Sequence, residues 1–177
     1  EEIVGFITKQ HRERLPLIGK TALVTAGPTY EPIDPVRFIG NHSSGKMGIA
    51  IAEQLARLGA EVTLVAGPTS HPSHASVCRV DVTSAKEMND ACQKRFNGAD
   101  ITVMSAAVAD YTPRTVAAQK IKQSSPDLTL DLVKNIDILA TMGEQKKPGQ
   151  ILVGFALETE NEEENAVAKL KKKNLDF

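Results

Sequence analysis

Short apolar, β-branched runs alternate along this chain with amphipathic segments, and this alternation constrains the fold more than any other feature. Such a pattern predicts parallel strands joined by crossover helices. The predicted strands are 20–26, 61–66, 77–82, 100–107, 127–133 and 151–157, and the predicted helices are 44–58, 84–97, 135–146 and 161–173. We therefore expect an α/β fold, a Rossmann-like, mostly parallel sheet with helices on both faces.

Composition narrows the class of protein. With 177 residues, 41% of them hydrophobic, the chain can bury one sizeable core. The net charge of −1 gives no general attraction to nucleic acid or to an anionic membrane. No apolar run reaches the ~20 residues that span a bilayer, and no leader pattern opens the chain. The expected protein is cytoplasmic, with neither a nucleic-acid nor a membrane partner. Cys78 and Cys92 lack metal-ligand spacing and are expected to be buried and reduced.

The loop between the first predicted strand and the first predicted helix is long, polar and rich in Pro and Gly. Such loops in compact α/β domains are usually functional. A helix start leaves backbone N–H groups unpaired, and its partial positive charge favours a phosphate. The residues of this predicted anion site are Ser43, Ser44, Gly45 and Gly48, with positive charge from Arg37 and Lys46. The alternative is a surface loop in which Ser43 or Ser44 caps the helix.

Two familiar phosphate-binding patterns do not fit this loop. Residues 40–46 match the first seven positions of a Walker A motif, but Met47 replaces the hydroxyl residue that would bind Mg²⁺. The dinucleotide fingerprint needs its glycines in the turn after the first strand, and that turn is Gly27-Pro28-Thr29. A nucleotide site of another kind stays open.

Other unusual residues follow predicted strands, at the edge of a parallel sheet where ligands bind. Three alanines in residues 106–109 allow a flat ligand to approach, and Asp110 offers an acceptor for a sugar hydroxyl, unless it caps a helix. Lys120 and Lys122 would project together from an extended segment toward a polyphosphate, although exposed lysine pairs are usually only solvated. Lys169 and Lys173 share a helix face that suits a triphosphate, but helix stability also explains them.

Taken together, these segments resemble the phosphopantothenate–cysteine ligase (phosphopantothenoylcysteine synthetase) domain of bacterial coenzyme A biosynthesis. The resemblance runs from about residue 19 to the end of the chain. The matching motifs are Ala26-Gly-Pro-Thr29, Glu31-Pro-Ile-Asp-Pro-Val-Arg-Phe38, Asn41-His-Ser-Ser-Gly-Lys-Met-Gly48, Ala106-Ala-Val-Ala-Asp-Tyr111, Lys120-Ile-Lys122, Val133-Lys-Asn135, Gly154-Phe-Ala156 with Glu158-Thr159, and Lys173-Asn-Leu-Asp176.

The resemblance implies a two-step ligation with CTP and Mg²⁺. The carboxylate of 4′-phosphopantothenate attacks the α-phosphorus of CTP, pyrophosphate leaves, and the amine of L-cysteine then displaces CMP from the acyl-cytidylate. The Mg²⁺ ion is expected to be held by the nucleotide and waters, with no protein ligand named.

The resemblance also implies residue roles. Asn41 would stabilise the acyl-cytidylate and assist the attack of cysteine, Arg37 would position that intermediate, and Lys120 would stabilise charge at phosphorus. The implied ligands of the substrate phosphate are Gly27, Ser43, Gly45 and Gly48. The implied nucleotide-binding residues are Ala106, Ala107, Asp110, Lys120, Ile136, Asp137, Ile138, Leu139, Phe155, Lys169 and Lys173. Tyr30 and Ile136 stand where other members often carry Arg and Pro.

The resemblance further implies a homodimer whose partner subunit reaches into the site, and a fused upstream flavin-dependent decarboxylase that would hold FMN. Residues 1–18 are expected to be the tail of that upstream domain plus a linker, and residues 19–177 the ligase domain without its C-terminal part. One rival interpretation, a short-chain-type oxidoreductase, needs Tyr-x-x-x-Lys, but Asp34 follows Tyr30 and Thr115 follows Tyr111 at that spacing. A non-catalytic nucleotide-binding module is the second rival.

Overall fold

The computed structural model describes residues 3–5, 10, 14–122, 127–156 and 162–177. Part of the predicted upstream tail and linker, residues 1–18, therefore falls outside the described residues, and the Glu158-Thr159 motif falls entirely outside them.

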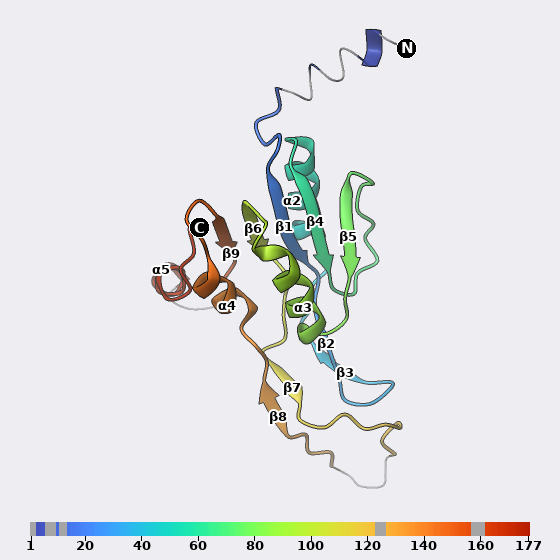
Figure 1. The fold of residues 1–177 in the computed structure, drawn as a ribbon. Helices are drawn as coiled ribbons and strands as arrows, with labels where there is room; N and C mark the ends of the chain where they lie inside the picture. The colour runs from blue at the N-terminus through green and yellow to red at the C-terminus, as the bar shows by residue number, and fades with distance from the viewer. Residues whose placement is uncertain (1–2, 6–9, 11–13, 123–126, 157–161) are drawn as a thin grey trace.

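Five parallel strands form the central sheet, in the order β5-β4-β1-β6-β9 (Figure 1). Their bounds are β1 Thr21–Ala26, β4 Glu61–Ala66, β5 Val77–Asp81, β6 Ile101–Met104 and β9 Ile151–Gly154. The central strand β1 is buried from its second residue to its last. Burial on both faces explains why it reads as a continuous apolar run. The predicted parallel sheet is confirmed.

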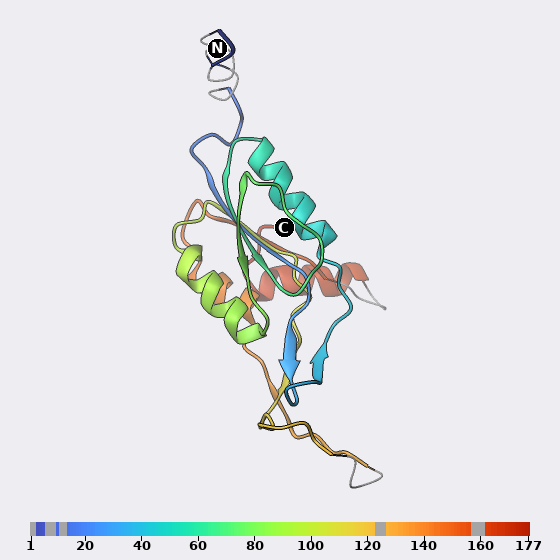
Figure 2. The same cartoon turned by 90° about the vertical axis from the view of Figure 1, so that its right-hand side faces the viewer.

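Helices cover both faces of this sheet, and Figure 2 shows α2 and α3 on opposite sides of it. Their bounds are α2 Lys46–Arg57, α3 Ala85–Phe96, α4 Ile138–Gln145 and α5 Glu162–Lys172. Consecutive residues of a strand point to opposite faces, so Val24 packs in the cluster of α2, whereas Leu23 packs with Met88 and Phe96 of α3 and Met142 of α4. The predicted two-faced covering is confirmed. None of the helices in the described part of the chain is long and apolar enough to cross a membrane.

Two antiparallel ribbons lie beyond the carboxyl ends of the sheet strands (Figure 1). One pairs β2 (Tyr30–Pro32) with β3 (Phe38–Gly40), and the other pairs β7 (Tyr111–Pro113) with β8 (Leu132–Lys134). We call β7, β8 and the described residues between them the arm. The prediction that 127–133 is a strand of the central sheet was wrong, because only its end forms β8. Most residues in 127–132 are exposed, which fits a solvent-exposed antiparallel ribbon and not a buried parallel strand.

The two cysteines differ in environment. Cys92 on α3 is buried, as predicted, and burial raises the pKa of its thiol to about 12. Cys78 is exposed, so that prediction was wrong. It lies on β5, which is an edge strand of the sheet. An edge position leaves a side chain in an apolar run partly uncovered.

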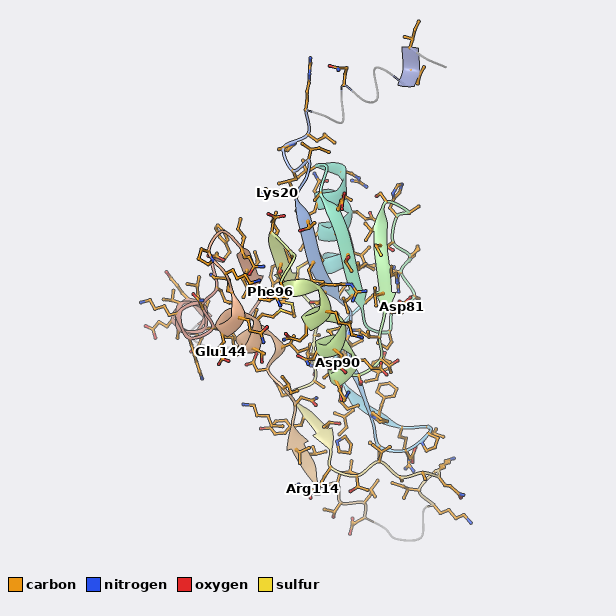
Figure 3. The ribbon with its side chains drawn as sticks, in the orientation of Figure 1. Lys20, Asp81, Asp90, Phe96, Arg114 and Glu144 are labelled. Atoms are coloured by element: carbon orange, nitrogen blue, oxygen red, sulfur yellow. The ribbon has the colours of Figure 1, made fainter. Side chains whose placement is uncertain are left out.

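Asp100 ties the start of β6 to the start of β1, at the end of the sheet that Lys20 marks in Figure 3, away from Arg114 on the arm. It accepts hydrogen bonds from the Thr21 backbone N–H and the Lys20 ammonium, both at 2.9 Å. The Thr21 N–H, the Lys20 ammonium and the Thr21 hydroxyl lower the pKa of Asp100 from 3.8 to about 2.

We expect this lowered pKa to make Asp100 stabilising above about pH 4, with the stabilisation lost as the pH falls through about 2. The Asp100→Asn variant should therefore have a lower urea midpoint of unfolding at pH 7 than the native protein. Between pH 7 and pH 2 its urea midpoint should fall by less than that of the native protein. Equal losses in the two proteins would contradict this assignment.

Candidate functional site

The N-terminus of α2 presents backbone N–H groups that the helix does not use. The first hydrogen bond of the helical ladder runs from the Ile49 N–H to the Gly45 carbonyl at 3.0 Å. The N–H groups of Lys46, Met47 and Gly48 therefore precede the ladder. These donors and the positive end of the helix dipole suit a phosphate.

The alternative of a serine cap does not hold. The residue that caps α2 is Gly45, which adopts φ 75° and makes no side-chain cap. The hydroxyls of Ser43 and Ser44 accept only long contacts of 3.4 Å, from Gly45 N–H and Lys46 N–H. The Thr69 hydroxyl donates to the Ser44 carbonyl at 2.7 Å and so holds the loop from outside.

Glycine is required at two of the predicted phosphate positions for different reasons. A Cβ on Gly45 would lie 3.1 Å from the Gly27 backbone N, and both glycines have positive φ. A Cβ on Gly48 would lie 2.6 Å from the Thr25 carbonyl oxygen. Gly48 thus lets α2 pack closely on β1, whereas Gly45 and Gly27 bring the loop and the end of β1 together.

Gly45→Val should weaken binding of 4′-phosphopantothenate by about tenfold or more, because strain at a non-glycine residue with positive φ costs on the order of 1–3 kcal/mol. Binding of CTP should change far less. Isothermal titration with each ligand measures both effects. Gly149→Val is the matched control, because Gly149 also has positive φ (87°) but no atom within 4 Å of its added Cβ. Equal losses of the two ligands would mean general damage to the fold.

Buried threonines of the first strand and its following turn position the alanine-rich segment 105–109. The Thr25 hydroxyl accepts from the Ser105 and Ala106 N–H groups at 3.0 and 3.1 Å, and the Thr29 hydroxyl accepts from Ala109 N–H at 3.0 Å. Both threonines have zero exposure. Sequence reasoning gave neither threonine a role, because Thr25 reads as an ordinary strand residue and Thr29 as an ordinary turn residue.

Asn41 follows β3 and lies against the same segment. Its side-chain N–H₂ donates to the Val108 carbonyl at 3.0 Å. Ala107 lies beside it, where its N–H donates to the Gly27 carbonyl at 2.9 Å. These contacts link the N-terminus of α2, Gly27 and Asn41 to residues 106–108.

A cavity of about 260 Å³ opens next to this segment. It gathers nine of the predicted nucleotide-binding residues from segments far apart in the sequence. They are Ala106, Asp110, Ile136, Asp137, Ile138, Leu139, Phe155, Lys169 and Lys173. Lys134 and Asn135, which belong to the matching motif Val133-Lys-Asn135, also line it. Ala107 does not line it, nor does Lys120, so these two are not brought into this cavity.

Charge in this cavity favours an anion. Three lysines line it, Lys134, Lys169 and Lys173, against two aspartates. Asp137 caps α4 by accepting from Ala140 N–H at 3.0 Å, and it pairs with the Lys173 ammonium at 2.8 Å. Burial raises the pKa of Asp137, but the Lys173 and Ala140 hydrogen bonds outweigh it and lower the pKa overall. A bound polyphosphate would compete with Asp137 for Lys173.

Arg37 and Lys120 meet at a second cavity, of about 520 Å³, between the β2–β3 turn and the loop of the arm. Its lining is Val36, Arg37, Lys120, Ile121 and Lys122. It shares no residue with the nucleotide cavity. The structure therefore brings two of the three predicted catalytic side chains together and places the third, Asn41, beside residues 106–108.

Asp34 holds Arg37 in this second cavity and was not among the predicted residues. The shortest contact between the two side chains is 2.6 Å, and the Asp34 side chain is fully buried. Burial raises the pKa of this carboxyl, but hydrogen bonds from the Arg37 guanidinium and from backbone N–H groups hold the pKa well below its usual range. Asp34 therefore remains a carboxylate anion at the cavity that Arg37 and Lys120 line.

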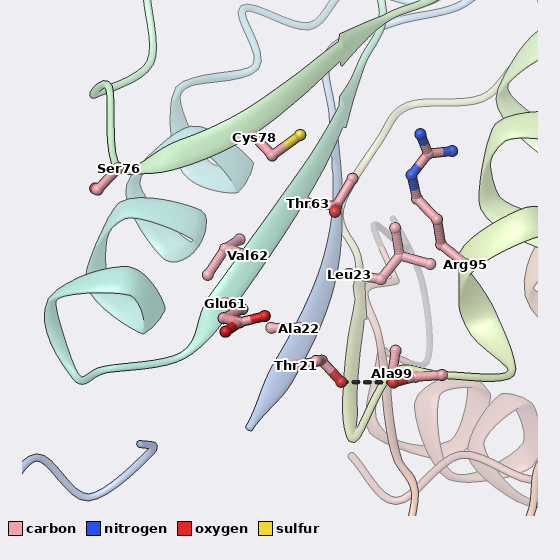
Figure 4. Close-up of a pocket in the computed structure, with 11 residues that line it drawn as sticks. Thr21, Ala22, Leu23, Glu61, Val62, Thr63, Ser76, Cys78, Arg95 and Ala99 are labelled. Carbon is pink, nitrogen blue, oxygen red and sulfur yellow. Dashed lines mark hydrogen bonds between the residues drawn. The ribbon is translucent and has the colours of Figure 1, made fainter. Parts of the chain in front are cut away.

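A third cavity, of about 400 Å³, lies at the opposite end of the sheet, where Figure 4 shows Thr21, Thr63, Cys78 and Arg95 around it. None of the predicted site residues lines it. Ligands of parallel α/β sheets bind beyond the carboxyl ends of the strands. We therefore place the functional site at the other two cavities.

Similar proteins show the family to which this sequence belongs. The sequence matches the family model described as the DNA/pantothenate metabolism flavoprotein C-terminal domain over residues 17–177. It is 51% identical over 177 residues to a cysteine/cysteine sulfinic acid decarboxylase of an unknown prokaryotic organism, covering 99% of this chain and 49% of that protein. It is 51% identical over 163 residues to the coenzyme A biosynthesis bifunctional protein CoaBC of Vibrio cholerae, covering 91% and 41%.

A solved structure shares the fold. The crystal structure of the C-terminal domain of coenzyme A biosynthesis bifunctional protein CoaBC has a TM-score of 0.81 and 48% identity, covering 90% of this chain and 76% of that one. The chain spans less than half the length of the two relatives above. Because the family model matches nearly the whole chain, the chain belongs to the family of the DNA/pantothenate metabolism flavoprotein C-terminal domain.

Proposed function

We propose that this domain joins 4′-phosphopantothenate to L-cysteine in coenzyme A biosynthesis, with CTP as the activating nucleotide. The observation that carries the proposal is the linked geometry of two anion sites. The α2 N-terminus contacts Gly27, Gly27 pairs with Ala107, and Ala106 lines the cationic cavity. A phosphorylated acid and a nucleotide bound at these two places would meet beside Asn41. The relatives named for coenzyme A biosynthesis support the same reaction.

The chemistry proceeds in two balanced steps. A carboxylate oxygen of 4′-phosphopantothenate forms a bond to the α-phosphorus of CTP while the bond to the leaving pyrophosphate breaks. The cysteine amine then forms the amide bond at the acyl carbon, CMP leaves, and the amine loses one proton to solvent. Lys120 serves the first step and Asn41 the second, whereas Arg37 positions the intermediate.

Mg²⁺ enters this scheme with CTP. Asp110 and Asp137 are oxygen donors at the cavity, which suit this hard ion. Within the described residues, no three His, Cys, Asp or Glu side chains gather into a metal site. We therefore propose that the phosphates of the nucleotide and waters would occupy most of the coordination positions of the ion. FMN belongs in this proposal only to the upstream decarboxylase fused to the domain in the intact protein.

The domain is proposed to act as a homodimer. Large apolar side chains are exposed on the β2–β3 ribbon and at the start of β7. The exposed fractions are 61% for Val36, 49% for Phe38 and 52% for Tyr111. A second copy packed there would cover these side chains. The Lys120 of that copy would then approach the nucleotide cavity of the first copy, which the first copy's own Lys120 does not line. Val36→Asp should then shift the intact protein toward a smaller species in sedimentation velocity.

The direct test gives the intact protein 4′-phosphopantothenate and CTP and measures pyrophosphate. Release should require both substrates, and adding cysteine should yield CMP and the amide. CTP should be strongly preferred over ATP, and equal turnover with ATP would overturn the nucleotide assignment. If pyrophosphate is absent and CO₂ is released from cysteine sulfinate, the activity named for the other relative would be favoured instead.

A further inference from the structure

Asp34 makes an unusually complete set of hydrogen bonds for one carboxylate. One oxygen accepts from the Val36 and Arg37 N–H groups at 2.8 and 2.9 Å. The other accepts from Arg37 Nε at 3.0 Å, from the Arg37 terminal nitrogen at 2.6 Å and from the Ile121 N–H at 3.1 Å. Only the first two of these bonds serve the local turn.

One of the remaining contacts reaches the backbone of a residue 87 positions further along the chain. The Ile121 N–H donates to Asp34, and the Ile121 carbonyl accepts from the Arg37 terminal nitrogen at 2.8 Å. The Asp34–Arg37 pair therefore binds both polar groups of the Ile121 residue. A second tie, from Ala117 N–H to the Ile33 carbonyl at 2.9 Å, lies four residues earlier.

Ile121 stands between Lys120 and Lys122, and both lysines are exposed. An exposed lysine in a segment without helix or strand adopts many conformations, and restricting it to one of them costs conformational entropy. Holding the neighbouring peptide removes most of the backbone share of this cost. Arg37 commits its Nε and one terminal nitrogen to Asp34 and Ile121, so part of its effect on catalysis would also pass through this backbone contact.

We infer that Asp34 is a positioning residue that fixes Lys120 through the Ile121 peptide. The inference rests on the proposed function, in which Lys120 acts at phosphorus during acyl-cytidylate formation. Asp34 itself touches neither substrate, because its side chain is fully buried beneath Arg37. Its effect should therefore be largest on the step that needs Lys120.

The test measures the two half-reactions separately in the intact protein carrying Asp34→Asn. Asparagine keeps the size of the side chain but removes its charge. Pyrophosphate release should slow by about 10- to 100-fold, since small misplacements of a catalytic group cost this much. Amide formation from added phosphopantothenoyl-cytidylate and cysteine should slow far less than pyrophosphate release, because Asp34 affects this step only through Arg37. Equal slowing of both steps, or of neither, would overturn the inference.

Asp131→Asn is the matched control. Asp131 also pairs with an arginine, Arg114, at 2.6 Å on the arm, but both side chains are well exposed. Exposed pairs contribute little, so this variant should keep both rates. If the native protein releases no pyrophosphate from CTP, the proposed function fails. If the native protein releases pyrophosphate and the Asp34→Asn variant releases it at the same rate, only the inference about Asp34 fails.

Hydrogen exchange on the ligand-free native protein decides the matter if Asp34→Asn does not fold. The Ile121 amide should exchange more slowly than the amides of Lys120 and Lys122, because it donates to a buried carboxylate. Exchange of all three at the rate of an open peptide would show that the peptide is not held in solution, and the inference would fall.

Discussion

Lys120→Gln is expected to reduce pyrophosphate release from CTP and 4′-phosphopantothenate by about 10²- to 10³-fold, the usual loss when a donor to a developing anionic centre is removed. Glutamine stays polar and is only one bond shorter than lysine, so the loss reports mainly the removal of the charge. Lys120 is exposed at the Arg37 cavity, where its ammonium can meet a substrate. A single-turnover measurement of pyrophosphate in the intact protein gives the rate.

Two further variants give this result its meaning. Lys122→Gln removes the same charge two residues away at the same cavity and should lose much less. Lys147→Gln removes an exposed lysine that lines none of the three cavities and should lose nothing measurable. If Lys120→Gln and Lys122→Gln behave alike, the cavity provides only general attraction for the triphosphate, and the role of Lys120 at phosphorus is wrong.

Asn41→Asp is expected to divide the reaction at the acyl-cytidylate. Asn41 donates to the Val108 carbonyl, and an ionised aspartate has no proton to donate there. Its negative charge would also lie beside the acyl phosphate. Pyrophosphate should appear in a single burst, the acyl-cytidylate should persist in the mass spectrum, and little amide should form. If pyrophosphate release fails as well, Asn41 binds substrate and has no separate role in the second step.

Asn135→Asp is the matched control for this prediction. Asn135 donates to the Ala109 carbonyl at 2.8 Å, so the change removes the same kind of bond from the same segment. Asn135 also lines the nucleotide cavity, and its variant should weaken CTP binding without accumulation of acyl-cytidylate. Accumulation in both variants would mean that movement of residues 105–109, and not the Asn41 amide, causes the effect.

Local patterns in the sequence were enough to predict the five strands of the central sheet and the helix α2. Strand β1 is a continuous apolar run and helix α2 has a clear helical periodicity, because each buries a continuous surface. The resemblance grouped residues such as Asp110, Phe155 and Lys173, which the fold does bring to one cavity. Their roles in binding stay predictions, as do the dimer and the nucleotide.

Other features depend on segments that meet only in the folded chain. The end of the segment 127–133 pairs with β7, while β9 takes the place beside β6 in the sheet, and neither pairing is visible in the segment itself. Cys78 is exposed because β5 is at the sheet edge, a property of strand order and not of local composition.

By itself, the sequence determined the alternation of strands and helices, the glycine-rich start of α2 and the set of polar residues at the strand ends. The tertiary structure alone decided which of those polar residues meet. Asp34 shows the physical reason most clearly. A buried carboxylate is stable only when hydrogen-bonded, and one of its donors comes from Ile121, 87 residues away, a distance at which no local pattern in the sequence carries information.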